Sequence, residues 1–309
     1  MPGIHYARLT YTTSNLGDDI QTVATLPFLN HTSYSFNRDT LALEKSDEQY
    51  IIIMNAWWAA VPEKAFPPAG CFLPVFIGFH LTQSSVAYFS RTHCVDYLKA
   101  HAPIGCRDIA TINILKTWSV ETFFSGCLTT TFQRRESEPV TGKIFLVDTE
   151  RVNYLIPSIF KEGAVQVTHQ YTGDSANREK AVEDLLHQYR TSASLIITTR
   201  LHAALTCSAM GIPVVFFFHP DDPRATTAEQ IGLSMHKYFL IQPGWLKKGM
   251  IKFHITFLWT WFEKVIFWTK YTFFQKIEWN PQPLSFEGHK NKLIDKTREM
   301  IQIQLNRFN

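Results

Sequence analysis

Short apolar runs separated by polar turns recur along the first part of the chain. Residues 4–12 alternate apolar and polar positions, as a half-buried strand does. Residues 50–56 and 72–81 are apolar on both faces, as strands of a covered parallel sheet are, although Pro74 and Gly78 interrupt the second run. Helical spacing follows at residues 94–102 and 109–116. The pattern therefore predicts strands that alternate with helices.

The same alternation returns after residue 142. The expected strands are residues 143–147, 164–168, 194–198 and 214–218, and the expected helices are residues 155–161, 177–190 and 200–210. Strands that alternate with helices form parallel sheets joined by right-handed crossovers. At 309 residues the chain is long enough for two such domains with a cleft between them. We therefore expect an α/β fold of two Rossmann-like domains, over residues 1–130 and 131–245, followed by a tail over residues 246–309.

The expected tail is basic and aromatic. From residue 247 onward there are eleven Lys and Arg against five Asp and Glu, and five of the eight tryptophans lie at or after Trp245. Residues 250–274 are long enough to cross a bilayer, but four charged residues interrupt them. Trp, Phe and Ile cover most of the helical projection, which predicts an amphipathic helix lying at a membrane surface. The alternative is a helix packed on this protein or on a second subunit.

Cysteine usage and the N-terminal sequence both favour the cytoplasm. The five cysteines are scattered, with no C-x-x-C pair that would indicate zinc or a redox dithiol. The first residues lack the basic and apolar regions of a secretory signal. We expect a protein on the cytoplasmic side, with no metal and no nucleic-acid partner.

Two short segments place guanidinium groups beside the ends of predicted elements. Arg107 directly precedes the helix at residues 109–116, and Arg200 and His202 follow the strand at residues 194–198. Ligands of open α/β sheets bind beyond the carboxyl ends of the strands, and helix N-termini favour anions. The arginine fork can bind phosphate or carboxylate at two points. These residues predict a site for a small, strongly anionic substrate.

Each candidate also has an ordinary structural interpretation. Arg107 can form an ion pair with the adjacent Asp108, and His80 lies in an apolar run where a core histidine is common. The charged segment at residues 221–224 is typical of a solvated turn, although it also suits a loop beside a substrate.

A Gly-containing turn at residues 14–19 precedes a helix that is expected to begin near Ile20. Asp18 and Asp19 are equally suited to cap this helix and to contact an acceptor molecule.

Six motifs occur in order along the chain, namely residues 15–21 (NLGDDIQ), 78–80 (GFH), 103–108 (PIGCRD), 125–129 (SGCLT), 199–205 (TRLHAAL) and 211–215 (GIPVV). Together, from about residue 6 to about residue 218, the sequence resembles the polysaccharide pyruvyl transferase family. The resemblance implies a fold similar to the two-domain GT-B glycosyltransferases. It also implies that Arg107, Arg200, Leu201 and His202 surround phosphoenolpyruvate, whose pyruvyl group is moved onto a sugar as a ketal without a cofactor.

The chemistry suggests roles for these side chains. Arg107 and Arg200 would anchor the phosphate and carboxylate, and His202, as an imidazolium, would protonate the methylene carbon or stabilise the departing phosphate. The sugar hydroxyls need proton acceptors, for which the candidates are Asp18, Asp19, Asp108 and His80.

We therefore expect a pyruvyl transferase that acts on a surface polysaccharide, such as a capsule or lipopolysaccharide, or on its lipid-linked precursor. Its partners would be phosphoenolpyruvate, a glycan or lipid-linked oligosaccharide, and the inner face of the cell membrane through residues 250–274. One alternative is a glycosyltransferase that uses a nucleotide sugar on the same scaffold. A second is a non-catalytic protein of polysaccharide assembly.

Overall fold

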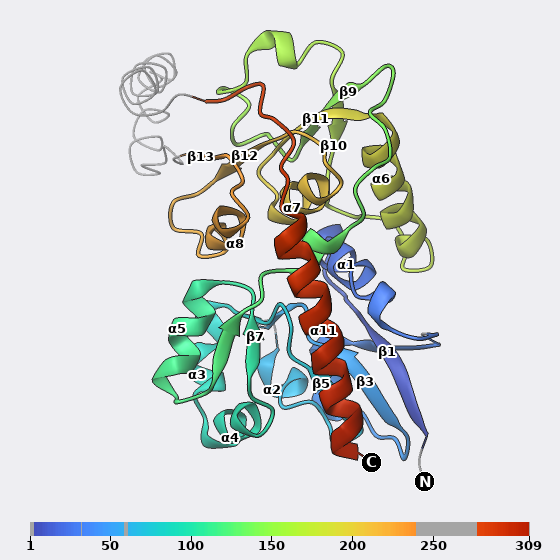
Figure 1. Cartoon of the computed structure of the whole chain (residues 1–309), viewed down its shortest axis with the longest axis vertical. Helices are drawn as coiled ribbons and strands as arrows, with labels where there is room; N and C mark the ends of the chain where they lie inside the picture. Colours follow the sequence, from blue (N-terminus) through green and yellow to red (C-terminus); the bar gives the residue numbers. More distant parts are fainter. Residues whose placement is uncertain (1–2, 32, 59–60, 239–276, 309) are drawn as a thin grey trace, which may run out of the picture.

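Two parallel sheets dominate the computed structural model, which describes residues 3–31, 33–58, 61–238 and 277–308 (Figure 1). The first sheet has the order β2-β1-β3-β5, with strands β1 (Ile4–Thr10), β2 (Tyr34–Asn37), β3 (Gln49–Ile53) and β5 (Phe72–Val75). The second has the order β10-β9-β11-β12-β13, with strands β9 (Lys143–Val147), β10 (Val165–Val167), β11 (Ala193–Thr198), β12 (Val214–Phe218) and β13 (Met235–Lys237). The predicted α/β class with parallel sheets is confirmed.

Two small parallel pairs flank the first sheet. They are β4 (Trp57–Trp58) with β6 (His80–Leu81), and β7 (Ile104–Cys106) with β8 (Thr122–Phe124). The apolar run at residues 72–81 is divided into β5 and β6, and Gly78, one of the two residues expected to interrupt it, lies between them with a left-handed φ of +68°. A Cβ at this glycine would lie 1.9 Å from Asn55 Oδ1, so only glycine allows the turn.

Helices lie between the strands at most of the expected positions. The longer ones are α1 (Leu16–Val23), α4 (Thr92–Ala100), α5 (Ile109–Thr117), α6 (Arg178–Ser192), α7 (Leu201–Ala209) and α11 (Glu287–Phe308). The shorter ones are α2 (Pro62–Ala65), α3 (Val86–Phe89) and α8 (Ala225–Gln230), with 3-10 turns η1 (Leu26–Phe28), η2 (Arg38–Leu43), η3 (Gln83–Ser85), η4 (Leu128–Thr131) and η5 (Ser158–Phe160).

Two sequence predictions about helices are wrong. Helix α1 begins at Leu16, not near Ile20, because the Asn15 side chain accepts a hydrogen bond from the Gly17 amide and caps the helix there. Asp18 and Asp19 therefore lie in its first turn and do not cap it.

The second error concerns residues 155–161, where the expected helix is reduced to the turn η5. Pro157 explains the difference, since a proline disfavours the helical conformation of the residue before it.

Helix α1 belongs by chain order to the first sheet but packs against the second. Leu16 and Ile20 share a buried cluster with Leu201 and Leu205 of α7. The loop that precedes α1 is joined to the loop after β10 by hydrogen bonds from Leu16 N to His169 O (2.8 Å) and from Tyr171 N to Ser14 O (2.6 Å). An element of the first sheet thus forms part of the second sheet's surroundings.

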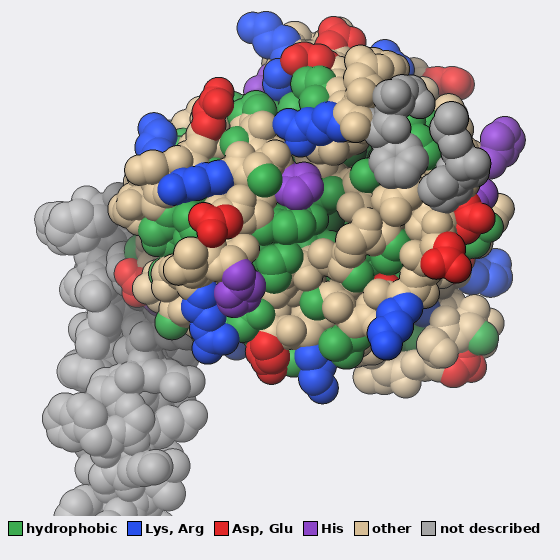
Figure 2. All heavy atoms as spheres, turned by 90° about the horizontal axis from the view of Figure 1, so that it is seen from below, with side chains coloured by type: hydrophobic (Ala, Val, Ile, Leu, Met, Phe, Trp, Pro, Cys, Tyr) green, Lys and Arg blue, Asp and Glu red, His purple; other side chains and the backbone are tan. Residues whose placement is uncertain are grey.

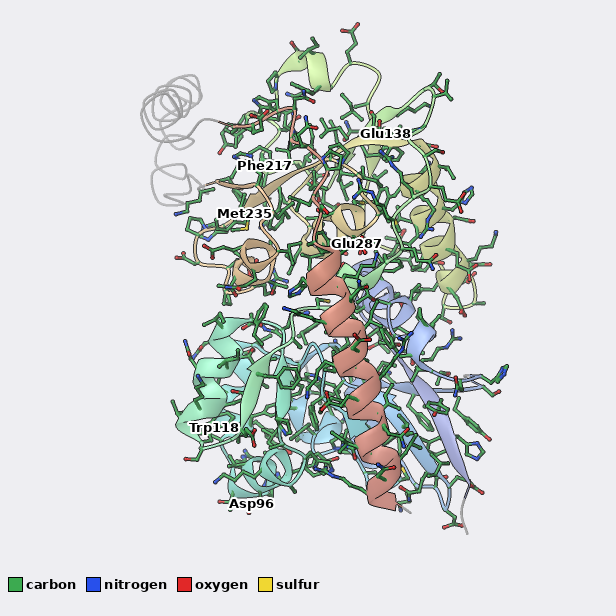
Figure 3. The ribbon with its side chains drawn as sticks, viewed as in Figure 1. Asp96, Trp118, Glu138, Phe217, Met235 and Glu287 are labelled. Atoms are coloured by element: carbon green, nitrogen blue, oxygen red, sulfur yellow. The ribbon has the colours of Figure 1, made fainter. Side chains whose placement is uncertain are left out.

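Helix α11 returns from the second sheet and covers the first (Figure 1). Its buried Leu293, Met300 and Ile301 form a cluster with Ile53 of β3 and Val75 of β5. Figure 3 shows Glu287 where α11 begins, between the two sheets. The amphipathic stretch at residues 250–274 lies outside the described residues, and the domain boundaries remain predictions.

Seen from below, the molecule presents Lys and Arg side chains interspersed with Asp and Glu (Figure 2). On α11 several basic residues pair with acidic ones one turn away, as in Lys296 with Glu299 and Lys290 with Glu287. Within the described ranges, every helix is too short or too polar to cross a membrane.

Candidate active site

A cavity of about 520 Å³ opens at the carboxyl ends of the second sheet's strands. Its wall includes Asp148 after β9, His169 after β10 and Arg200 after β11. The chain reverses its direction of strand addition between β9 and β11, and open α/β sheets bind ligands at such a switch point. Asn15 and Gly17 complete the wall from the first part of the chain.

Two helix N-termini point their dipoles at this cavity. Helix α1 begins between Asn15 and Gly17, and helix α7 begins at the N-cap Arg200, whose side chain does not cap it. The amides of the first turn of α7 are therefore not satisfied by the N-cap side chain. Free amides and a positive dipole end favour an anion.

Arg200 is half-buried in the wall and is held at one nitrogen. Its Nε donates to Asp148 Oδ2 over 2.6 Å, and its side chain is 34% exposed. As predicted from its place after β11, it lies at the carboxyl end of the sheet. Leu201 and His202, which follow it, also line the cavity.

Arg224 is a second cation in the wall that the sequence analysis did not select. Its Nε and Nη2 bind the Asp222 carboxylate at 2.8 and 2.7 Å, and both residues line the cavity. The solvated-turn interpretation of residues 221–224 is therefore incomplete, because the turn also faces the site. Only the substrate-side alternative in the sequence pattern pointed to it.

His202 is buried and lies within 3.5 Å of the Arg107 guanidinium, measured from Nε2 to Nη1. Burial lowers the pKa of His202 well below its usual value, and the charges of Arg107 and Arg224 lower it further. A guanidinium can only donate, so Nε2 faces it as an acceptor and the neutral ring carries its proton on Nδ1. The expected imidazolium is therefore not the state of His202 in the protein alone.

Arg107 lies behind His202 and outside the wall of the cavity. It is 1% exposed, and its Nη1 donates to Gln21 Oε1 over 2.8 Å. Its Nε has no hydrogen-bond partner in the described part of the chain. Thr227 of α8 donates to the Arg107 carbonyl over 2.9 Å, so a helix beyond the second sheet holds this backbone in place. Gln21 is a further residue that sequence reasoning missed.

Asp108 and His80 form a buried pair beside Arg107. His80 Nδ1 donates to Asp108 Oδ2 over 2.5 Å, and Asp108 Oδ1 caps α5 by accepting from Thr111 N over 2.8 Å. Burial and the Arg107 charge lower the pKa of His80 to about 4. Burial alone would raise the pKa of Asp108, but its contact with His80 lowers it overall. Asp108 therefore pairs with His80, and no hydrogen bond joins it to Arg107 within the described residues.

Asp18 and Asp19 occupy separate environments. Asp18 is 1% exposed and accepts hydrogen bonds from Thr13 Oγ1 (2.6 Å) and Trp57 Nε1 (3.0 Å). Asp19 is bound at both oxygens by Arg178 of α6. Neither lines the cavity that contains His202.

Residues that hold metals are not grouped in the described ranges, where no three His, Cys, Asp or Glu come together as a ligand set. All five cysteines are buried and free. The expectation that the reaction needs no metal or cofactor stays a prediction.

The fold and site define an α/β protein with a polar cavity, suited to anions, at the carboxyl ends of a parallel sheet. The chain belongs to the polysaccharide pyruvyl transferase family, whose model matches residues 15–218, which confirms the resemblance drawn from the motifs. The family description indicates a transferase that acts in polysaccharide biosynthesis.

Among solved structures, the chain is similar to a functionally uncharacterised protein from Klebsiella pneumoniae subsp. pneumoniae NTUH-K2044. The two are 13% identical, with a TM-score of 0.47, over 76% of this chain and 93% of the other. No curated protein matches the chain.

Proposed function

We propose that this protein transfers the pyruvyl group of phosphoenolpyruvate onto a sugar of a surface polysaccharide, or of its lipid-linked precursor, as a ketal. The observation that carries the proposal is the meeting of Arg200, Arg224 and His202 in one cavity at the N-terminus of α7. In this proposal the two sheets form a GT-B-like pair of domains, and the reaction takes place in the cleft between them.

The donor carries a phosphate and a carboxylate on one enol carbon, and the site offers cationic anchors for both. The two terminal nitrogens of Arg200 and the first-turn amides of α7 suit one anion. The other is suited to Arg224 Nη1, the terminal nitrogen that does not bind Asp222. The proposed role of Arg107 is indirect, because it lies behind His202. Its charge and its contact with Nε2 would hold the imidazole ring toward the donor.

His202 is proposed to gain a proton on Nε2 when the donor binds, which ends the contact that Nε2 makes with Arg107 in the protein alone. The anionic donor offsets the positive charges of Arg107 and Arg224, which lower the pKa of His202 in the protein alone. The imidazolium then gives a proton to the methylene carbon of the donor, which leaves C2 electrophilic. Proton uptake on donor binding would allow His202 to be neutral in the protein alone and still act as the acid expected from the sequence.

The remaining steps balance without a further reactant. One sugar hydroxyl oxygen bonds to C2, the bond from C2 to the phosphate oxygen breaks with its electron pair, and a second hydroxyl oxygen takes its place. Of the two hydroxyl protons, one restores the imidazolium and the other leaves with phosphate. The acceptor-side roles of Asp18, Asp19, Asp108 and His80 stay predictions, since each is already hydrogen-bonded within the protein.

The test uses the full chain with phosphoenolpyruvate or candidate nucleotide sugars and a membrane glycolipid extract. We expect phosphate release only when phosphoenolpyruvate and acceptor are both present, with a matching pyruvyl mass added to the glycolipid. Release of a nucleotide would instead favour the glycosyltransferase alternative. Turnover of neither donor, with binding of glycolipid alone, would favour the assembly protein.

The proposed location is the cytoplasmic face of the membrane, reached through residues 250–274. Its test must leave α11 in place, because this helix covers the first sheet. Replacing residues 250–274 with a polar linker should release the protein from anionic vesicles, whereas unchanged binding would contradict the proposal.

A further inference from the structure

Asp148 joins the carboxyl ends of three adjacent strands, and it does so at the rim of the cavity. We infer that Asp148 is a positioning residue, which fixes the Arg200 guanidinium so that its two terminal nitrogens face the anionic donor. The inference rests on the proposed function for the identity of the donor. Nothing in the sequence around residue 148 pointed to this role.

The contacts of Asp148 engage both of its carboxylate oxygens. Oδ2 accepts from Arg200 Nε (2.6 Å) and from the His169 amide (3.0 Å), and Oδ1 accepts from Thr168 Oγ1 (2.6 Å). Its own carbonyl accepts from Thr199 Oγ1 (2.7 Å). One residue at the end of β9 therefore holds the ends of β10 and β11 in register around the cavity.

The backbone of Asp148 is in a conformation that few residues adopt. Its φ is +49°, and a left-handed conformation costs an L-residue other than glycine about 1 kcal/mol or more. Asp and Asn adopt it most readily among the residues with a Cβ. The conformation is retained here because it turns the carboxylate back toward both neighbouring strand ends.

The way Arg200 is held differs from the other paired arginines nearby. Arg224 and Arg178 each donate from both Nε and Nη2 to one carboxylate. Arg200 donates only Nε to Asp148. Within the described part of the chain its two terminal nitrogens have no hydrogen-bond partner, so both can bind a ligand. A carboxylate bound to the terminal nitrogens would compete with the donor, whereas one bound at Nε orients the group without blocking it.

The Asp148 carboxylate keeps its charge throughout the range of ordinary assays. Burial alone would raise the pKa of Asp148, but the hydrogen bonds from Thr168 and His169 and the Arg200 charge lower it overall. The bond to Arg200 is therefore charge-assisted at neutral pH, which is the stronger kind.

The test compares Asp148→Asn with Asp184→Asn in the full chain. Asn suits the left-handed backbone and matches the shape of Asp, so D148N removes the charge with little strain. Asp184 is exposed on α6, so D184N makes the same charge change away from the cavity. Calorimetric titration with phosphoenolpyruvate should show about a tenfold weaker Kd for D148N and no change for D184N.

Further readouts separate positioning from general structural damage. KM for phosphoenolpyruvate should rise about tenfold in D148N while kcat changes little. In an Arg200→Lys background, D148N should add little further loss, because the group that it orients is gone. The Arg200 Nε–H signal in 15N-edited NMR should be slow to exchange in the unchanged protein and should exchange faster in D148N, because an amide oxygen accepts the bond without a charge.

The outcomes distinguish this inference from the proposed function. If D148N binds the donor as well as the unchanged protein does, while R200K does not, the positioning role is wrong. If the unchanged protein fails to bind phosphoenolpyruvate, the donor assignment fails. Faster exchange of the Nε–H signal in D148N would still support the Asp148–Arg200 contact if the donor assignment fails, and an exchange rate equal to that of the unchanged protein would contradict the contact.

Discussion

At the scale of single residues, the site depends on a histidine that is neutral until its substrate arrives. His202 touches Arg107 through its unprotonated nitrogen and lies in the wall of the cavity. This arrangement keeps the ring oriented but uncharged in the free protein, and it ties the acid form to the presence of an anionic donor.

His202→Gln should lower kcat by roughly a hundredfold or more, the usual size of a general acid–base contribution, while the donor still binds. The measurement is steady-state phosphate release together with titration of phosphoenolpyruvate. His187→Gln, at an exposed position on α6, should behave like the unchanged protein. Full activity of H202Q would remove the histidine from the chemistry.

Sequence reasoning located part of the site and missed the rest for identifiable reasons. Arg200 and His202 were found because a strand end and a family motif coincide there. Asp148 was missed because its contact with Arg200 joins residues far apart in the chain. Arg224 pairs with Asp222 only two residues away, but no local pattern shows that this turn faces the cavity. Arg107 was expected in the cavity wall, but the distance from a motif to a cavity surface depends on packing that no local pattern encodes.

At the scale of elements, the N-terminus of helix α1 lies close to His202. A Cβ on Gly17 would lie 3.0 Å from His202 Nδ1, in a helix where glycine is otherwise unfavourable. The absence of a side chain at Gly17 therefore allows the N-terminus of α1 to approach the imidazole.

Gly17→Ala should lower kcat by about tenfold or more, because displacement of the imidazole by a few tenths of an ångström disturbs a reacting group. The matched control is Gly288→Ala in the first turn of α11, where an added Cβ meets no atom within 4 Å. G288A should raise stability by about 0.5 to 1 kcal/mol through helix propensity and leave activity unchanged. Equal activity of the two variants would show that the ring tolerates the methyl group.

Element positions were predicted more accurately than element ends. Four of the five strands of the second sheet, β9 to β12, and helices α5 and α6 were placed within a few residues, because each has a clear apolar pattern. The short strand β13 was not predicted. The start of α1 was misplaced because the capping role of Asn15 depends on one side-chain hydrogen bond. The packing of α11 on the first sheet was not predicted, because its few buried apolar residues are separated by many charged ones.

At the scale of the whole molecule, the ion pair of Arg178 with Asp19 joins helix α6 to helix α1, which follows β1 of the first sheet in the chain. The pair is bidentate and its side chains are 14% and 18% exposed, so it is shielded from solvent. Arg178→Ala should lower the free energy of unfolding by roughly 2 kcal/mol, because Asp19 is left partly buried without its partner. Lys180→Ala, which breaks an exposed pair on the same helix, should cost less than about 0.5 kcal/mol in the same urea titration.

Buried neutral histidines make the whole fold sensitive to acid. Burial lowers the pKa of both His80 and His169 to about 4, and that of His202 well below its usual value. The unfolded chain takes up protons below pH about 6.5 that the folded chain cannot, so stability falls as pH decreases from about 6.5 toward about 4.

Between pH about 7 and about 5.5 the three histidines together should cost roughly 3 kcal/mol of unfolding free energy. Urea titrations across this range measure the slope, and His169→Gln should make it smaller, because one of the contributing histidines is removed. The pKa values of Asp108 and Asp148 are lowered in the folded protein, so the stability that these carboxylates provide is lost only at more acidic pH. A flat profile above pH about 5 would show that the buried rings gain protons without cost.

The return of α11 to the first sheet imposes an order on synthesis. Strands β3 and β5 leave the ribosome early, but the helix that covers their apolar face is translated only after the whole second sheet. The apolar face of β3 and β5 thus stays uncovered by α11 during most of chain elongation. Chaperones commonly bind nascent chains that expose such apolar surface. The packing of the first sheet is therefore complete only when the C-terminal helix α11 has been synthesised.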